Sequence, residues 1–195
     1  MIGRLLLRIR QLGQPHALPR RLLVALLQVA SETEARALRP HERTLLREAY
    51  LRAAGARFTR PFHVAQGFRL HLSAPLHVGP RACFGENTGL FIHAPVTIGA
   101  DFLAAPGLTV NNGTHDLATL RPAATPLTVG DRVWCAVNVT LVAGAQLGDD
   151  CVVGANSLVM HPIPPRCLAV GAPARVVRRD IRPQDAPDFW RGFAT

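Results

Sequence analysis

The chain has 195 residues, of which 48% are hydrophobic, so it is long enough for one domain with an appendage. Its 22 basic residues are all arginine, and together with 13 acidic residues they give a formal net charge of +9. Residues 1–60 carry 12 Arg and 4 acidic residues, whereas residues 61–165 carry 4 Arg and 6 acidic residues. A nucleic-acid-binding protein more often carries a basic stripe through its folded body. The charge distribution therefore argues against nucleic acid as a partner.

The apolar segments are too short for a membrane span, because none approaches 18 residues. Arg8 and Arg10 interrupt the first of them, which argues against a secretory signal peptide. The four cysteines form no CxxC pair, which favours a reducing compartment. We therefore expect a cytoplasmic protein.

Residues 1–60 are predicted to form an N-terminal helical segment. Within residues 22–30, leucines and an alanine lie on one face of a basic amphipathic helix. Such a helix can contact an anionic membrane peripherally, but packing against its own domain or a neighbouring subunit is favoured. A second helix is predicted over residues 41–54, with Gly55 as its stop.

Residues 61–172 carry a repeat of six residues, which is neither the helical nor the plain strand period. Two-residue slippage at Leu90–Ile92 and a break after Val110 interrupt it. The inward aliphatic series is Leu72, Val78, Phe84, Leu90, then Ile98, Ala104, Val110, then Val129, Cys135, Leu141, Leu147, Val153 and Val159. A fixed hexapeptide period is the signature of a parallel β-helix.

In such a β-helix each hexad forms one short strand and a corner, and three hexads form one triangular coil. The aliphatic residues should stack inward about 4.8 Å apart. Small residues four places later should turn inward near the corner, so Cys135 and Cys151 are expected in the core. Glycines such as Gly130, Gly148 and Gly154 should supply the unusual corner backbone.

The period fails over residues 116–127, which are predicted to form a loop that leaves the β-helix. The sequence Asn-Asn-Gly-Thr-His-Asp, residues 111–116, stands directly before it. Loops on rigid scaffolds often carry function, so His115 and Asp116 are candidate site residues. Residues 162–179, rich in proline, should close the β-helix, and residues 173–195 are predicted to form a C-terminal tail.

Several segments, in this order, resemble the hexapeptide-repeat acyltransferases of the maltose, galactoside and nodulation O-acetyltransferase type and the polysaccharide-biosynthesis acetyltransferases. They are ERTLLREAYLRAAGARFTRPFHVAQG (42–67), HAPVTIG (93–99), NGTHD (112–116), VGDRVW (129–134) and IPPRCLAVGAPARVV (163–177). The resemblance implies an all-β core with a left-handed parallel β-helix, an N-terminal helical segment and a homotrimer with sites between neighbouring prisms. It implies acetyl-CoA as the acyl donor, no metal requirement and a hydroxyl acceptor on a saccharide or other small molecule.

The family pattern also implies roles for individual residues. His115 matches the catalytic histidine, and histidine is the natural general base near neutral pH. Asp116 would orient the imidazole or, as the favoured alternative, cap the loop. The residues implied to bind the acceptor are Asn87, His93, Trp134 and Asp116. The residues implied to bind acetyl-CoA are Val137, Ala155, Met160, His161, Arg175 and Arg178.

The acceptor side departs from the family pattern, because His93 stands where the family has a sugar-binding carboxylate and Gly85 replaces the first of two asparagines. These departures argue against a simple disaccharide acceptor and leave the acyl-transfer machinery in place.

Two alternatives remain open. One is a catalytically idle hexapeptide scaffold. The other is a zinc protein like the γ-type carbonic anhydrases, for which His71 and His77, a hexad apart, could stack on adjacent coils.

Overall fold

The computed structural model describes residues 40–182, and the N-terminal residues that include the amphipathic segment 22–30 lie outside them. Helix α3 (Pro40–Ala54) confirms the helix expected over residues 41–54. Gly55 follows with a φ of 90°, the left-handed conformation expected of a residue just past a helix end. Strands begin at Arg57, earlier than the expected start at residue 61. Within residues 40–182, no helix is long and apolar enough to cross a membrane.

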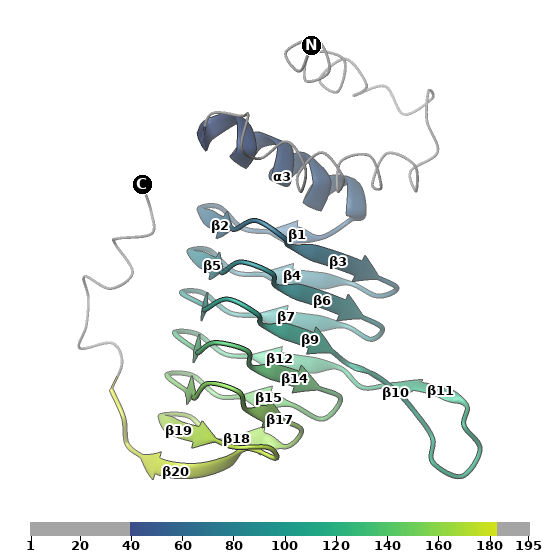
Figure 1. The fold of residues 1–195 in the computed structure, drawn as a ribbon, viewed down its shortest axis with the longest axis vertical. Coiled ribbons are helices and arrows are strands. Elements are labelled where there is room, and N and C mark those ends of the chain that lie inside the picture. The colour runs from purple at the N-terminus through teal and green to yellow at the C-terminus, as the bar shows by residue number, and fades with distance from the viewer. Residues whose placement is uncertain (1–39, 183–195) are drawn as a thin grey trace. The chain divides into compact units, whose positions relative to one another are not determined.

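Residues 57–179 form a parallel β-helix with three sheets, which we call sheets A, B and C (Figure 1). Sheet A contains β1 (Arg57–Phe58), β4 (Leu76–Val78), β7 (Val96–Ile98), β12 (Leu127–Val129), β15 (Gln146–Leu147) and β18 (Pro162–Ile163). Sheet B contains β2 (Phe62–Val64), β5 (Ala82–Phe84), β8 (Leu103–Ala104), β13 (Trp134–Cys135), β16 (Val152–Val153), β19 (Cys167–Val170) and the antiparallel β20 (Arg175–Arg179). Sheet C contains β3 (Arg69–Leu72), β6 (Gly89–Ile92), β9 (Thr109–Asn111), β14 (Thr140–Val142) and β17 (Leu158–Val159).

Each coil runs through sheets A, B and C in turn and then climbs to the next coil. Three edges result: the AB edge, the BC edge and the CA edge, where sheet C of one coil leads to sheet A of the next. Val78 pairs with Ile98 on the next coil, and Ile98 pairs with Val129 on the coil after that. The coil that begins with Ile98's strand is longer in sequence than its neighbours. Its extra residues form a separate hairpin of β10 (Gly113–His115) and β11 (Pro122–Ala124), which projects from the stack at the CA edge (Figure 1).

The six-residue period predicted for residues 129–159 is confirmed by burial. The inward aliphatic residues and Cys135 are at most 4% exposed, and the small residues four places later are at most 1% exposed. Burial of such an aliphatic side chain contributes about 1.5–3 kcal/mol. Cys83, Cys135, Cys151 and Cys167 are all buried free thiols, and burial raises the pKa of the first three.

At the corners the residue with left-handed backbone is not the glycine directly after the inward residue, as expected, but a residue two places further on. The third residue after each of the first five inward residues, from Val129 to Val153, has a φ between 55° and 91°: Arg132, Asn138, Gly144, Asp150 and Asn156. The glycines expected in this role instead allow close packing between coils. A Cβ on Gly148 would lie 2.5 Å from the backbone nitrogen of Pro165 on the next coil.

The AB edge carries a column of alternating charge at these left-handed positions. Its members, one per coil, are Arg81, Asp101, Arg132, Asp150 and Arg166. Arg81 donates two hydrogen bonds to Asp101, of 2.6 and 2.8 Å, and Arg132 donates two to Asp150, of 2.7 and 3.0 Å. The paired carboxylates raise the pKa values of both guanidinium groups.

Candidate functional site

The hairpin of β10 and β11 carries the candidate base. Its register pairs Gly113 with Ala124 and His115 with Pro122, so His115 is the last residue of β10. The His115 side chain is exposed. The loop predicted over residues 116–127 is therefore an ordered antiparallel hairpin that starts at Gly113. His115 lies within its strands and not at a junction between coil and loop.

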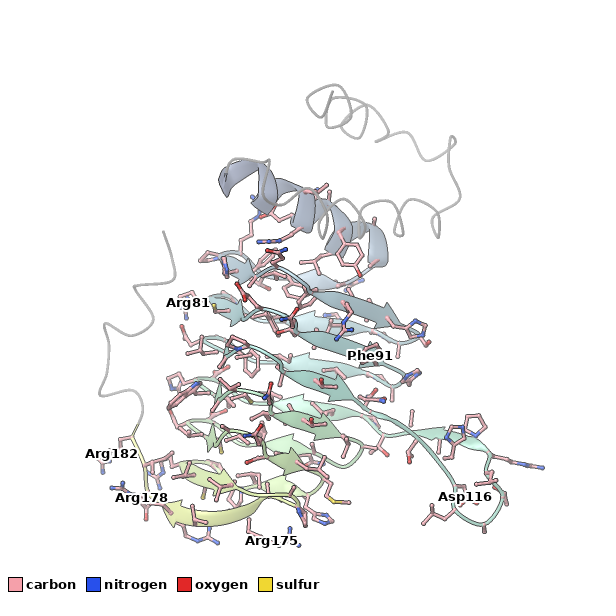
Figure 2. All side chains as sticks on the ribbon, in the orientation of Figure 1. Arg81, Phe91, Asp116, Arg175, Arg178 and Arg182 are labelled. Carbon is pink, nitrogen blue, oxygen red and sulfur yellow. The ribbon has the colours of Figure 1, made fainter. Side chains whose placement is uncertain are left out.

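The turn of the hairpin is closed by Asp116. Its Oδ1 accepts hydrogen bonds from the backbone nitrogens of Ala118 (3.2 Å) and Thr119 (2.8 Å) and from the Thr119 hydroxyl (2.7 Å). The Thr119 bonds hold the pKa of Asp116 below its usual value. Asp116 thus caps the turn, the favoured of its two expected roles, and Figure 2 shows it near the tip of the hairpin. Leu117 and Leu120 are exposed beside it.

On the two coils that precede the hairpin, the CA edge carries two histidines in contact. The rings of His71 and His93 lie 5.5 Å apart, and Ser73 Oγ lies 3.3 Å from His71 Nε2. His93 is exposed and lies against Gly113, where a Cβ would be 2.5 Å from its ring. The expected acceptor residue His93 therefore lies at the base of the hairpin that carries His115.

The expected stacking of His71 with His77 on adjacent coils is wrong. His71 pairs with Phe91 on sheet C, whereas His77 pairs with Thr97 on sheet A. One hexad covers only one side of a coil, whereas stacking requires a full turn through all three sheets. Across residues 40–182, no group of three or more His, Cys, Asp or Glu side chains could hold a metal ion.

Three other expected residues lie along the BC edge: Asn87, Val137 and Ala155. Asn87 adopts a φ of 59° and its side chain closes over Gly67 on the preceding coil. The Val137 side chain is 43% exposed, and its backbone oxygen accepts a hydrogen bond from Asn156 (2.9 Å). Met160 and His161 lie on the other side of sheet C, at the CA edge, and both are exposed. The expected donor residues thus bracket the last coils of sheet C.

Arg175 and Arg178 lie on one face of β20, although a spacing of three would place them on opposite faces of a regular strand. The register explains this, because Arg175 pairs with Val170 and Arg178 with Leu168, with an irregularity between Leu168 and Ala169. Such a bulge shifts the alternation of side chains. Both guanidinium groups are exposed at the end of the stack (Figure 2).

Trp134 lies on β13, on the outer surface of sheet B, and is 39% exposed. Its register neighbours are Leu103 and Val152. Sheet B is the side of the prism that does not meet the CA edge. A single chain therefore does not bring Trp134 to the hairpin that carries His115.

The amino-acid sequence is similar to those of several acetyltransferases. The chain is 32% identical to galactoside O-acetyltransferase of Escherichia coli over 123 residues, which are 60% of this chain and 60% of that protein. It is 29% identical to the putative colanic acid biosynthesis acetyltransferase WcaF of Escherichia coli over 133 residues, 67% of this chain and 73% of WcaF. No protein-family model matches the chain.

A solved structure matches the fold over most of its length. It is the hexapeptide-repeat-containing acetyltransferase VCA0836 of Vibrio cholerae, complexed with acetyl coenzyme A, with a TM-score of 0.65 and 24% identity over 84% of this chain and 88% of that one. The chain resembles the hexapeptide-repeat acetyltransferases in sequence and fold. The left-handed parallel β-helix expected from the sequence is confirmed, and the relatives together support an acetyltransferase.

One residue of this hexapeptide-repeat fold escaped the sequence reasoning. Asn112 is completely buried and forms four side-chain hydrogen bonds at the base of the hairpin. Its spacing from Ile92 indicates an inward position, because Asn112 follows Ile92 by one full coil. The sequence Asn-Asn-Gly is more typical of an exposed turn, so local sequence does not indicate burial of Asn112.

Proposed function

We propose that this protein transfers an acetyl group from acetyl-CoA to a hydroxyl group of a saccharide or another hydroxylated small molecule, with His115 as the general base. The observation that carries the proposal is the hairpin, which interrupts an otherwise regular stack and presents an exposed histidine at the CA edge. Similarity to a galactoside acetyltransferase and to a structure complexed with acetyl coenzyme A supports the acceptor and donor classes.

The reaction needs one proton acceptor and one site for negative charge. Neutral His115 takes the proton of the acceptor hydroxyl as its oxygen attacks the thioester carbonyl carbon. The tetrahedral intermediate then collapses to the ester, and the departing CoA sulfur recovers the proton from His115. General-base assistance of this kind is typically worth about 10²–10⁴ in rate. Backbone N–H groups are suitable donors to the oxyanion.

The donor would lie along the last coils. Met160 and His161 at the CA edge, and Val137 and Ala155 at the BC edge, would line its pantetheine arm. Arg175 and Arg178, which the bulge places on one face, would bind the phosphates of the nucleotide, for which guanidinium groups are well suited. Asp116 has no direct role in this scheme beyond holding the turn.

The acceptor would be bound by His93 beside His115 and by Asn87 and Trp134. Because sheet B and the BC edge lie away from the CA edge of the same prism, Trp134 and Asn87 of one copy would meet His115 of a neighbouring copy. The proposed active form is therefore a homotrimer with each site between two prisms. Trp134 and its apolar neighbours on sheet B suit such a contact.

A thiol-release assay tests the proposal. The protein is incubated with acetyl-CoA and a panel of sugars, sugar nucleotides and hydroxylated metabolites, beside a His115→Ala variant. His77→Ala is the matched control, since His77 is an exposed histidine on sheet A. Acceptor-dependent release that His115→Ala abolishes and His77→Ala retains is the expected result. Release that is unchanged in His115→Ala would remove His115 as the base.

If no acceptor in the panel gives thiol release, acetyl-CoA binding is measured by calorimetry. Binding without turnover would direct the search to other acceptors. A protein that binds no acetyl-CoA would overturn the proposal in favour of a catalytically idle scaffold.

A further inference from the structure

The hairpin is attached to the stack by one buried amide. Asn112 occupies an inward position, because the register places it one coil after Ile92, which itself lies one coil after Leu72. Ile92 and Asn112 are both completely buried. An asparagine thus stands where the two preceding coils have aliphatic residues, of which Ile92 is buried and Leu72 half-buried. A buried amide without partners would cost about 1–3 kcal/mol, so its presence needs a reason.

The hydrogen bonds of Asn112 supply that reason. Its Oδ1 accepts from the backbone nitrogens of His93 (2.8 Å) and Ala94 (3.3 Å) on the preceding coil. Its Nδ2 donates to the backbone oxygens of Ala94 and Thr125, both at 2.9 Å. The side chain therefore joins the preceding coil to both ends of the hairpin. No buried side-chain polar atom within residues 40–182 is left without a partner.

Comparison with the preceding coil shows what the amide replaces. There, the backbone nitrogen of Ser73 donates to the backbone oxygen of Ile92 (2.8 Å), which links two coils at the CA edge. One coil later, the backbone nitrogen of His93 donates to the side-chain oxygen of Asn112 instead. The backbone oxygen of Asn112 is then available to accept from Thr125 (3.1 Å) across the hairpin base. One residue thus keeps the coil ladder continuous and closes the hairpin.

We propose that Asn112 is a positioning residue that fixes the hairpin, and with it His115, on the CA edge. The inference rests on the proposed role of His115 as base. Asn112 does not touch the reacting atoms; it sets where the imidazole, further along β10, is held. A displacement of a catalytic group by about 1 Å can cost about 100-fold in rate.

The test uses Asn112→Leu, which restores an aliphatic residue to the inward column and removes every side-chain bond to the hairpin. We expect kcat to fall about 10- to 100-fold with an unchanged KM for acetyl-CoA and a cooperative thermal melt. Asn112→Ala, which adds no bulk, should behave in the same way if the leucine does not fit. The matched control is Asp131→Ala, which deletes a side-chain bond between coils (Asp131 Oδ1 to the Ala100 nitrogen, 2.7 Å) at the AB edge and should leave kcat unchanged.

A nitroxide on Ala118→Cys provides a readout independent of turnover, and the buried native cysteines should not compete for the label. The label should become more mobile when Asn112 is replaced and not when Asp131 is. Wild-type kcat in folded Asn112→Leu, together with an inactive His115→Ala, would reject the inference alone. A loss of activity that only follows the folded fraction, or an immobile label, would also reject it. Full activity of His115→Ala would instead reject the proposed base.

Discussion

The AB and CA edges of the same β-helix are built in opposite ways. At the AB edge each of the five coils from the second onward turns at a left-handed residue, and alternating charges pair between coils. At the CA edge the coils differ from one another, with His93 on one, the hairpin on the next, and Met160 with His161 on the last. A repeated fold can thus keep one edge uniform and vary another, and the proposed chemistry lies on the varied edge. Changes at the CA edge should therefore affect turnover, and changes at the AB edge should affect stability.

Removal of the hairpin should have the largest effect. The backbone of Asn112 is already bonded to that of Thr125, so two glycines can replace residues 113–124 and close the corner. Without His115 we expect a loss of about 10²–10⁴ in kcat, measured by thiol release. The stack should still melt cooperatively. Retained turnover would show that the chemistry resides elsewhere.

A methyl group at the AB edge should have the next largest effect. A Cβ on Gly79 would lie 2.6 Å from the carbonyl carbon of Gly99 and 2.7 Å from the backbone nitrogen of Ala100, both on the next coil. Because backbone cannot yield as a side chain can, Gly79→Ala should cost about 1–3 kcal/mol in urea unfolding. In Gly89→Ala the close atoms belong to the Phe91 ring, so this control should cost less. Equal costs would contradict the role given to backbone packing.

The charge column should contribute a smaller amount. Asp150→Ala removes the partner of Arg132, whose side chain is 35% exposed. Because solvent screens such a pair, the coupling energy in a double-mutant cycle with Arg132→Ala should be about 1 kcal/mol. The coupling should decrease between low and high salt. A coupling that salt leaves unchanged would show that packing, and not charge, dominates the contact.

The turn of the hairpin should show the smallest effect, limited to acid pH. The pKa of Asp116 is lowered by the Thr119 bonds, so its carboxylate stabilises the turn above its ordinary pKa. That stabilisation should be lost as pH falls through the lowered value. Chemical shifts of Thr119 should follow this titration in the wild type and lose it in Asp116→Asn. A shift of the Asp116 titration toward higher pH would contradict the capping role.

Much of the fold follows from sequence because burial itself is periodic. Val129, Leu141 and Val153 each fill an inward position, and the six-residue spacing alone predicts this. His115 was identified by its place beside a break in the period and by the family pattern. The role of Asn112 does not follow from local sequence, because it depends on its neighbour on the preceding coil, which is distant in sequence.

Other features depend on pairing that no local pattern contains. The common face of Arg175 and Arg178 results from an irregularity in the pairing of β20 with β19. The assignment of the corner backbone to glycine was wrong because φ at each corner is set by the strand geometry, and Arg132 and Asn138 adopt it without being glycine. Trp134 and His115 lie on different sides of the prism, and this follows only once each hexad is assigned to one of the three sheets.

The alternating column at the AB edge also acts as a check on assembly order. If a folding chain omitted one coil and stacked the next in its place, two like charges would meet: Arg81 would face Arg132, or Asp101 would face Asp150, depending on the coil omitted. Like charges in direct opposition are destabilising, and nearly identical coils otherwise offer little to distinguish one neighbour from the next. A residue pattern that stabilises the correct stack thus also penalises its most similar misfolded competitor.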